Sequence, residues 1–390
     1  MPLSSPQHYI GHPLDALPTP CLTLDRAKLM VNLERMQVFA NTAGKHLRAH
    51  VKTHKCTRLA KLQVELGANG ICAAKLSEAE GLSRAGVREI LITGPVATKE
   101  AHARLAWLAA EDRTLIVTLD DFENARALSA LFVEAGVRLR CLLDLDVGQQ
   151  RTGVKPEYAA AFAAALSTLP GLQLVGMQAY AGHAQHLKTI AERRAENRRC
   201  LTIACALYRE LAPRYGFTTL SATGTGSADF DVEFPELTEL QCGSYAVMDA
   251  DYLAIEQSSK PYEIALTLQS SVVSAQQRRF VTIDAGLKTL YKDGAPPRVL
   301  SPMSTPPASP NGPRTPFIYD WFGDEYGRLS LPSGIDHPAE RVKSSLPLGQ
   351  RVELSLSHCD PTINLFDTFF VTEEGVVTDV WPIDLRGASQ

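Results

Sequence analysis

Three consecutive residues near the end of the chain, His358-Cys359-Asp360, could bind a divalent metal ion. They follow a strand-like run over 351–356, and continued strand alternation would place His358 and Asp360 on one face and Cys359 on the other. An imidazole beside a carboxylate suits Mn²⁺ or Mg²⁺, whereas an imidazole beside a thiolate would favour Zn²⁺. Taken alone, such a triplet is more often a polar strand end before a proline turn, so its meaning depends on the rest of the chain.

A lysine and two glycine-rich loops form a second set of residues that could take part in catalysis or cofactor binding. Lys52 lies at the end of a strand-like segment, in the run 49–55, and the loops cover 222–227 and 241–245. Backbone N–H groups of such loops can approach a phosphate closely, and serine or threonine hydroxyls add further donors. A strand-end lysine together with a phosphate cradle predicts pyridoxal phosphate held as a Schiff base. The alternatives are a surface lysine and two ordinary turns.

The elements that must position these residues alternate between helices and short apolar strands. Helices are expected over 24–43, 57–66, 156–166 and 187–211, and eight strands over 47–51, 70–74, 90–93, 115–119, 139–145, 172–179, 219–221 and 237–241. This alternation implies a parallel sheet, and eight strands in about 220 residues fit a (β/α)₈ barrel of the TIM type. Such barrels carry their catalytic groups at the C-terminal strand ends and hold phosphate after strands seven and eight, where Lys52 and the two loops fall. A doubly wound open sheet is the alternative.

The pattern changes after residue 262, where strands follow one another without helices between them. These strands are expected over 264–268, 280–283, 350–356, 369–371 and 376–380, with an irregular proline-rich loop over 301–316. We therefore predict a barrel domain over 22–261 that binds the cofactor. A mostly antiparallel β domain over 262–390, joined by the N-terminal segment 1–21, would carry the metal site.

The composition is that of an ordinary globular protein, with 390 residues, 45% hydrophobic and 21% charged, and a formal net charge of -4. The slightly acidic balance argues against a nucleic-acid partner or a polybasic membrane contact, and no apolar run approaches the roughly 20 residues that cross a bilayer. The eight cysteines are scattered, several within apolar runs. Free buried thiols in a reducing compartment explain this distribution better than disulfides do, so we expect a cytoplasmic protein.

Several short motifs along nearly the whole chain, taken in order, form a recognisable pattern. They are His-Val-Lys-Thr-His-Lys at 50–55, the runs 75–80 and 178–186, Asp-Val-Gly-Gln-Gln-Arg-Thr-Gly at 146–153, Gly-Thr-Gly-Ser at 224–227, and the runs 239–252, 284–288 and 358–367. In this order they resemble the D-threonine aldolase and D-serine dehydratase group of fold-type III pyridoxal-phosphate enzymes, whose barrel is alanine-racemase-like. The chain departs from the commoner family pattern at Ala74, 181–184 and 222–223.

The resemblance implies a role for each matching residue. Lys52 would be the Schiff-base lysine, with Lys55 ranked second. Tyr180 and His186 would line the substrate side and serve catalysis. Arg151 would contact the cofactor's phenolic oxygen or the substrate carboxylate, unless it only makes a salt bridge at a helix start. The remaining cofactor contacts would come from Tyr180, Thr223, Gly224, Thr225, Gly226, Gly243, Ser244 and Tyr245.

The resemblance also assigns His358 and Asp360 to the metal, which would be Mn²⁺ or Mg²⁺, with Zn²⁺ ranked below them. Dehydratase-like members resemble H-x-C and aldolase-like members resemble H-x-D, and this chain has aspartate two places after the histidine. We therefore expect an aldolase that cleaves a small D-β-hydroxy-α-amino acid of the D-threonine type to glycine and an aldehyde. The alternatives are a 3-hydroxy-D-aspartate aldolase, a D-serine dehydratase-like ammonia-lyase, a racemase and a cofactor-binding protein without catalysis. The resemblance further implies a homodimer.

Overall fold

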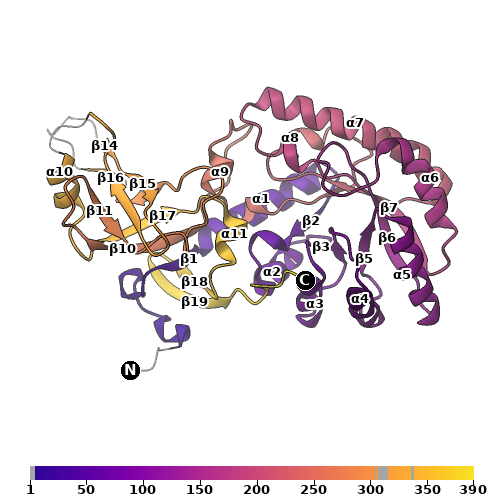
Figure 1. Ribbon diagram of the computed structural model, residues 1–390, viewed down its shortest axis with the longest axis horizontal. Coiled ribbons are helices and arrows are strands. Elements are labelled where there is room, and N and C mark those ends of the chain that lie inside the picture. The colour runs from indigo at the N-terminus through magenta and orange to yellow at the C-terminus, as the bar shows by residue number, and fades with distance from the viewer. Residues whose placement is uncertain (1–4, 303, 306–314, 335–337) are drawn as a thin grey trace. The chain divides into compact units, whose positions relative to one another are not determined.

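The computed structural model describes residues 5–302, 304–305, 315–334 and 338–390, and the chain divides into two compact units (Figure 1). The barrel unit comprises Leu33–Tyr245, Ile255–Lys260 and Gly387–Gln390, and the β unit comprises the remaining segments, which are Met1–Asn32, Ala246–Ala254 and Pro261–Arg386. The units differ from the predicted domains at several segments: residues 387–390 lie in the barrel unit, whereas residues 246–254 and 22–32 lie in the β unit. Residues 22–32 do so because Cys21–Asp25 forms strand β1, which pairs with two strands of the β unit.

The barrel unit contains a closed ring of eight parallel strands, which confirms the predicted TIM-type barrel and excludes the open sheet. The strands are β2 (His46–His50), β3 (Gly70–Ala73), β4 (Ile90–Ile92), β5 (Ile116–Leu119), β6 (Leu139–Asp144), β7 (Leu172–Gln178), β8 (Thr219–Ala222) and β9 (Glu239–Leu240). The unit contains the greater part of α1 (Arg26–Thr42), from residue 33 on. The other helices are α2 (Thr57–Glu65), α3 (Leu76–Arg84), α4 (Lys99–Glu111), α5 (Phe122–Glu134), α6 (Pro156–Ser167), α7 (Ile190–Tyr215) and the short α8 (Ala228–Asp231). Figure 1 shows α3 to α6 on the outside of the strands.

The barrel strands are short, and almost all of their residues are buried, as a parallel sheet covered by helices requires. Five apolar side chains, one from each of the strands β3 to β7, pack into a single cluster: Cys72, Leu91, Ile116, Leu142 and Val175. The long helix α7 begins at a capping box made by Thr189 and Glu192 and ends at Gly216, whose φ of 73° favours glycine.

A buried ion pair lies where the ring closes between β2 and β9. The Arg48 guanidinium donates to the Glu239 carboxylate at 2.6 and 3.1 Å, and it also donates to the backbone oxygen of Glu89. Both side chains are almost completely shielded from solvent. A Cβ on Gly70 would lie 2.4 Å from an Arg48 nitrogen, so the arginine fits only because this position of β3 has no side chain.

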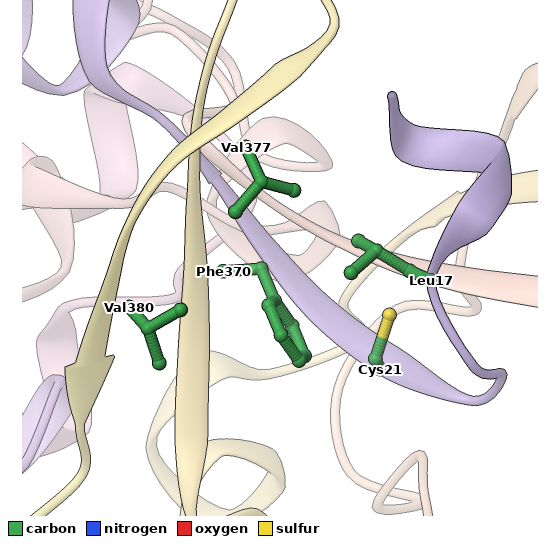
Figure 2. Packing of buried hydrophobic residues seen from close by; sticks show 5 residues of the cluster. All are labelled: Leu17, Cys21, Phe370, Val377 and Val380. Atoms are coloured by element: carbon green, nitrogen blue, oxygen red, sulfur yellow. The ribbon is translucent and has the colours of Figure 1, made fainter. Parts of the chain in front are cut away.

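The β unit is built on a nine-stranded sheet that runs β15-β16-β11-β10-β1-β18-β19, with β17 attached to β10 and β12 attached to β17. Its strands are β1 (Cys21–Asp25), β10 (Leu266–Ser274), β11 (Phe280–Ile283), β12 (Val299–Ser301), β15 (Ile318–Trp321), β16 (Gly327–Ser330), β17 (Arg351–Ser355), β18 (Thr368–Glu373) and β19 (Val376–Pro382). All pairs are antiparallel except β1 with β18. Leu17, Cys21, Phe370, Val377 and Val380 form one of its buried clusters, with the Phe370 ring in the middle (Figure 2).

Two sequence predictions need correction in the β unit. The helix expected over 24–43 is α1 (Arg26–Thr42), because the pairing of β1 takes Leu24 and Asp25 into the sheet. The insert 301–316 was expected to be irregular, yet it contributes the end of β12 and a short antiparallel pair, β13 (Ser304–Thr305) with β14 (Thr315–Pro316). Residues 303 and 306–314 of this insert lie outside the described part of the chain.

All eight cysteines are buried and free. Among the described helices, none combines the length and the apolar character that crossing a membrane requires.

We predict that Glu239→Gln destabilises the barrel unit by about 3 kcal/mol or more, because it leaves the Arg48 charge buried without a counter-charge. Urea unfolding followed by circular dichroism measures the change. Glu123→Gln is the matched control, since the Arg126–Glu123 pair is exposed and should contribute no more than about 1 kcal/mol. If the urea midpoint of the Glu239→Gln variant equals that of the Glu123→Gln variant, the buried pair does not stabilise the ring.

Candidate functional site

Lys52 lies directly after the first barrel strand, in a short 3₁₀ turn, η3 (Val51–Thr53). The backbone N–H of Lys52 donates to His50 Nδ1 at 3.4 Å, and His50 Nε2 lies 3.2 Å from Thr93 Oγ1 at the end of β4. The turn is therefore fixed to the neighbouring strand ends. Val51 and Thr53 on either side are buried, whereas the Lys52 side chain is partly exposed at the C-terminal rim of the barrel.

Lys55, the second candidate for the Schiff-base lysine, is already engaged in a buried ion pair. Its Nζ lies 2.8 Å from Glu78 Oε1 and donates to the backbone oxygen of Ala388 at 2.9 Å. Glu78 is fully buried, and its other oxygen accepts from the backbone N–H of Ala74 at 2.6 Å. Removing the Lys55 charge would leave this carboxylate unpaired, and that cost favours Lys52 as the reactive amine.

The two glycine-rich loops meet at the ends of β8 and β9, where the backbone N–H of Tyr245 donates to Thr225 Oγ1 at 3.1 Å. A Cβ on Gly243 would lie 2.6 Å from Thr53 Oγ1, so the second loop packs against the turn that holds Lys52. Gly243 and Ser244 are buried, yet their backbone N–H groups donate no hydrogen bond within the described part of the chain. Buried N–H groups are nearly always paired, so these two donors fit the phosphate of a pyridoxal cofactor.

A buried network supports the first of these loops from behind. Ser227 Oγ donates to Asp231 at 2.6 Å and accepts from Gln185 Nε2 at 3.0 Å, while Gln185 Oε1 accepts from the backbone N–H of Gly226. Burial raises the pKa of Asp231 to about 7, although the hydrogen bond from Ser227 opposes the rise. Asp231 was not predicted from the sequence. Its only signal was the four-residue spacing from Ser227, which places both on one face of a helical turn.

Tyr245 and Thr223, both expected to bind cofactor, have particular local geometries. The Tyr245 ring is fully buried, and its hydroxyl accepts from Gln63 Nε2 at 3.0 Å. Thr223 has a φ of 79°, which is uncommon for a residue with a β-branched side chain and is the type of strain found at functional loops.

A second polar network lies at the ends of β6, β7 and β9. The Asp144 carboxylate accepts from Thr152 Oγ1 and Gln178 Nε2, both at 2.9 Å, and Gln241 Nε2 donates to Gln178 Oε1 and to Ser221 Oγ at 3.0 Å. Burial raises the pKa of Asp144 to about 6 against the effect of its two hydrogen bonds. Thr152, Gln178 and Gln241 fall within motif runs that the sequence showed, but none of the five residues was given a role, because a single buried polar side chain has no distinctive spacing.

The remaining predicted residues of the barrel unit follow β6 and β7. Arg151 is exposed in the loop after β6, and its charge helps to lower the pKa of Asp144. Tyr180 follows the end of β7, and His186 lies beyond the turn η4 (Gly182–Ala184) in the same loop. Both side chains are partly buried. All three thus lie in loops at the C-terminal ends of strands, where TIM barrels carry their chemistry.

In the β unit, the triplet 358–360 is not the continued strand that the sequence predicted. The strand β17 ends at Ser355, His358 is the N-cap of helix α11 (Cys359–Ile363), and Asp360 lies in the first turn of that helix. The prediction failed because the chain turns into a helix before proline at 361, the kind of position near a helix start that proline tolerates. The expected pair nevertheless forms, with His358 Nε2 3.6 Å from Asp360 Oδ2.

Cys359 is separated from this pair, as the sequence predicted, but for a different reason. The residue is fully buried, its thiol donates to the backbone oxygen of Met248 at 3.3 Å, and its N–H donates to Asp249 Oδ2 at 3.0 Å. Burial raises the pKa of the thiol well above its usual value, and the Asp249 and Asp360 charges raise it further. A thiol in this environment is a poor metal ligand, because binding requires the thiolate.

The His358 side chain has carboxylates on both sides of its ring. Burial by itself lowers the pKa of the imidazole, but Asp360, Asp249 and Asp293 outweigh this effect and raise the pKa to about 9. Such a concentration of negative charge around one imidazole fits a hard divalent cation between His358 and Asp360.

Another group of possible metal ligands lies in the barrel unit. His183, Glu196 and Cys200 bring one ligand atom each to within 4.8 Å of one another, the only such trio found among the described residues. However, the Arg199 guanidinium donates to the Glu196 carboxylate at 2.6 and 3.0 Å and lies 3.5 Å from the Cys200 sulfur. This arginine already supplies positive charge, so an ion-pair cluster explains the arrangement.

We predict that stability falls as the pH rises from about 4 to about 7, partly because Asp231 is protonated in the folded chain and ionised in the unfolded chain over this range. Asp231→Asn removes this contribution while keeping an acceptor for Ser227. The variant should therefore gain on the order of 2 kcal/mol over the wild type between pH 5 and pH 8. Thermal unfolding across this range measures the difference, with Asp229→Asn as the exposed neighbouring control. Parallel pH curves for Asp231→Asn and wild type would contradict the assignment.

Sequence comparisons match the chain to known families and proteins. The family model of the alanine racemase N-terminal domain matches residues 24–251, and that of a serine dehydratase domain matches residues 265–372. The chain is 36% identical to D-threonine aldolase from Arthrobacter sp over 97% of its own length and 96% of that protein. It is 33% identical to 3-hydroxy-D-aspartate aldolase from Paracoccus denitrificans (strain Pd 1222), with the same two coverages.

The solved structure of D-threonine aldolase from Filomicrobium marinum has the same fold, with a TM-score of 0.86 and 34% sequence identity. The alignment covers 97% of this chain and 98% of that one, so both units are matched. The chain belongs to the D-threonine aldolase and D-serine dehydratase-like family of fold-type III pyridoxal-phosphate enzymes, which makes it a pyridoxal-phosphate-dependent lyase.

Proposed function

We propose that this lyase is an aldolase that cleaves D-β-hydroxy-α-amino acids of the D-threonine type to glycine and an aldehyde, with the help of a divalent metal ion. The observation that carries the proposal is the chemistry at 358–360. Asp360 faces His358, whereas Cys359 is buried with its thiol on the backbone of Met248. A site with one imidazole and one carboxylate favours Mn²⁺ or Mg²⁺ over Zn²⁺. The similarity to a D-threonine aldolase and to a 3-hydroxy-D-aspartate aldolase supports an aldol cleavage of this kind.

The cofactor would be held by residues of the barrel unit. Lys52 would bind its aldehyde carbon through Nζ, and the N–H groups of Gly243 and Ser244 would bind its phosphate. Further phosphate contacts would come from the loop 223–226, which Ser227 and Gln185 support. Tyr245 would act by positioning this loop, because its backbone N–H and its hydroxyl are both bonded within the protein. Arg151 and Tyr180 would contact the cofactor ring or the substrate.

When bound, the cofactor supplies an electron sink for the carbanion that forms when the Cα–Cβ bond breaks. His186 is our proposed base, and an imidazole nitrogen of this residue would take the proton of the β-hydroxyl group. As that proton leaves, the Cβ–O bond becomes the carbonyl of the aldehyde and the bonding pair remains on Cα. Protonation of Cα then gives glycine. His358 and Asp360 would hold the metal whose charge stabilises the developing alkoxide.

Three other reactions differ from the proposed one in the substrate or in the bond that breaks. A 3-hydroxy-D-aspartate aldolase would make the same bond cleavage and release glyoxylate. A D-serine dehydratase-like enzyme would expel the β-hydroxyl after deprotonation at Cα, and a racemase would return the same compound with inverted Cα. We also propose a homodimer in the cytoplasm. The eight free thiols are compatible with a reducing compartment, and the dimer rests on the family resemblance alone.

We expect the purified protein, loaded with pyridoxal phosphate and Mn²⁺, to convert D-threonine to glycine and acetaldehyde in equal amounts. EDTA should abolish the reaction, because the site at His358 and Asp360 would be emptied, and Mn²⁺ should restore it. Aldehyde is measured by coupling to alcohol dehydrogenase, with D-phenylserine and 3-hydroxy-D-aspartate as further substrates. Pyruvate and ammonia from D-serine that resist EDTA, without aldehyde from any of the three, would refute the proposal.

The two candidate lysines should differ in a way that absorbance and stability measurements separate. Lys52→Ala should lose the visible absorbance of covalently bound cofactor while it unfolds near the wild-type midpoint. Lys55→Met should retain that absorbance but lose about 3 kcal/mol or more of stability, because Glu78 is then buried without its partner. Retained absorbance in Lys52→Ala together with its loss in a folded Lys55→Met would reverse the assignment.

A further inference from the structure

The loop that precedes β12 brings an additional carboxylate to the predicted metal histidine. Asp293 Oδ2 lies 3.1 Å from His358 Nδ1, on the opposite side of the ring from Asp360. Residues 293 and 358 are 65 positions apart in the sequence, so no local motif joined them. The two ring nitrogens therefore have different partners, with Nδ1 facing Asp293 and Nε2 facing Asp360.

The Asp293 loop is held by several independent contacts. Ser357 Oγ donates to the backbone oxygens of Asp293 and Ala295. The backbone N–H of Ala295 donates to Asp251 Oδ1 at 3.1 Å, and that of Tyr291 donates to Thr362 Oγ1 at 3.2 Å. Ser357 is the residue before His358, and Thr362 lies in the helix that His358 caps. The loop is thus fastened to the same short segment that carries the histidine.

We propose that Asp293 is a positioning residue for the metal site, which accepts a hydrogen bond from His358 Nδ1 and so leaves Nε2 as the nitrogen that binds the metal. The inference rests on the proposed function, and it adds a residue that does not itself touch the metal. A histidine that binds a metal usually donates its other N–H to a carboxylate or carbonyl group, which fixes the tautomer, orients the ring and makes the ligand nitrogen more basic.

The other carboxylate near His358 cannot take this role. Asp249 is fully buried, and its two oxygens already accept from the backbone N–H groups of Tyr252 at 2.9 Å and Cys359 at 3.0 Å. It caps the helix α9 (Ala250–Leu253) and holds the start of α11. Asp293 is more than half exposed, so a substitution there should disturb the fold far less than one at Asp249.

The test is the affinity of the pyridoxal-phosphate-loaded, metal-stripped protein for Mn²⁺ alone, measured by calorimetry and by the signal of free Mn²⁺ in electron paramagnetic resonance. Asp293→Asn keeps an oxygen that can accept from Nδ1 but removes the negative charge, and should weaken binding about 10- to 100-fold, the usual effect of changing the partner of a ligand histidine. Asp293→Glu should restore part of the affinity. Asp324→Asn, which changes an exposed aspartate elsewhere in the β unit, should bind as the wild type does.

Two further measurements separate positioning from direct binding. The Mn²⁺ concentration for half-maximal activity should rise in Asp293→Asn, whereas kcat at saturating Mn²⁺ should stay within about threefold of the wild type. In the Mg²⁺-loaded wild type, nitrogen NMR should find the His358 proton on Nδ1. A proton on Nε2, or unchanged Mn²⁺ affinity in Asp293→Asn, would overturn the inference and leave the proposed reaction standing. Mn²⁺ binding that survives His358→Ala would instead overturn the metal site itself, and the role of Asp293 with it.

Discussion

The pairing of β2 with β9 is the constraint on which the cofactor side of this protein depends. It closes the ring of eight strands, and it sets the lysine turn after β2 beside the second glycine-rich loop after β9. The backbone N–H of His50 donates to the oxygen of Cys242 at 3.0 Å, so the alignment extends beyond the last paired residues of the strands. The buried Arg48–Glu239 pair lies at this ring junction. An open sheet would have placed β2 and β9 at separate edges.

The polar groups at this rim fall into two classes with opposite physical requirements. Lys55 and Glu78, Ser227 and Asp231, and Asp144 and Gln178 are buried groups whose hydrogen bonds are made within the protein. The N–H groups of Gly243 and Ser244 are buried without such partners in the described chain. The first class fixes the loops, since an unpaired buried group costs about 1–3 kcal/mol. The second class retains the capacity to bind an anion, and it can do so because the first class holds its backbone in place.

The sequence predicted most of the architecture, because repeated short apolar segments separated by helices leave few possible folds. It placed the eight barrel strands in the right order, and Lys52 and both loops at strand ends. It failed where pairing over a long distance decides the structure. β1 looks like the start of a helix until its partners β10 and β18, more than 240 and 340 residues away, are known. Glu78 and Asp293 were missed for the same reason, since each owes its role to a partner that only the folded chain brings near. Asp231 was missed although its partner Ser227 is only four residues before it.

Residues 358–360 show that an expected separation of side chains can persist although the local structure differs from the expected strand. Strand alternation predicted that Cys359 points away from His358 and Asp360. The segment is instead the start of a helix. The separation persists because the first residue of α11 is drawn into the core, where Asp249 accepts its N–H and Met248 accepts its thiol. Position 360 is then the one that faces His358. In the proposed metal site, the residue type at 360, rather than the thiol at 359, would therefore decide whether oxygen or sulfur is offered to the metal. A cysteine at 360 would shift the expected preference from Mn²⁺ or Mg²⁺ toward Zn²⁺.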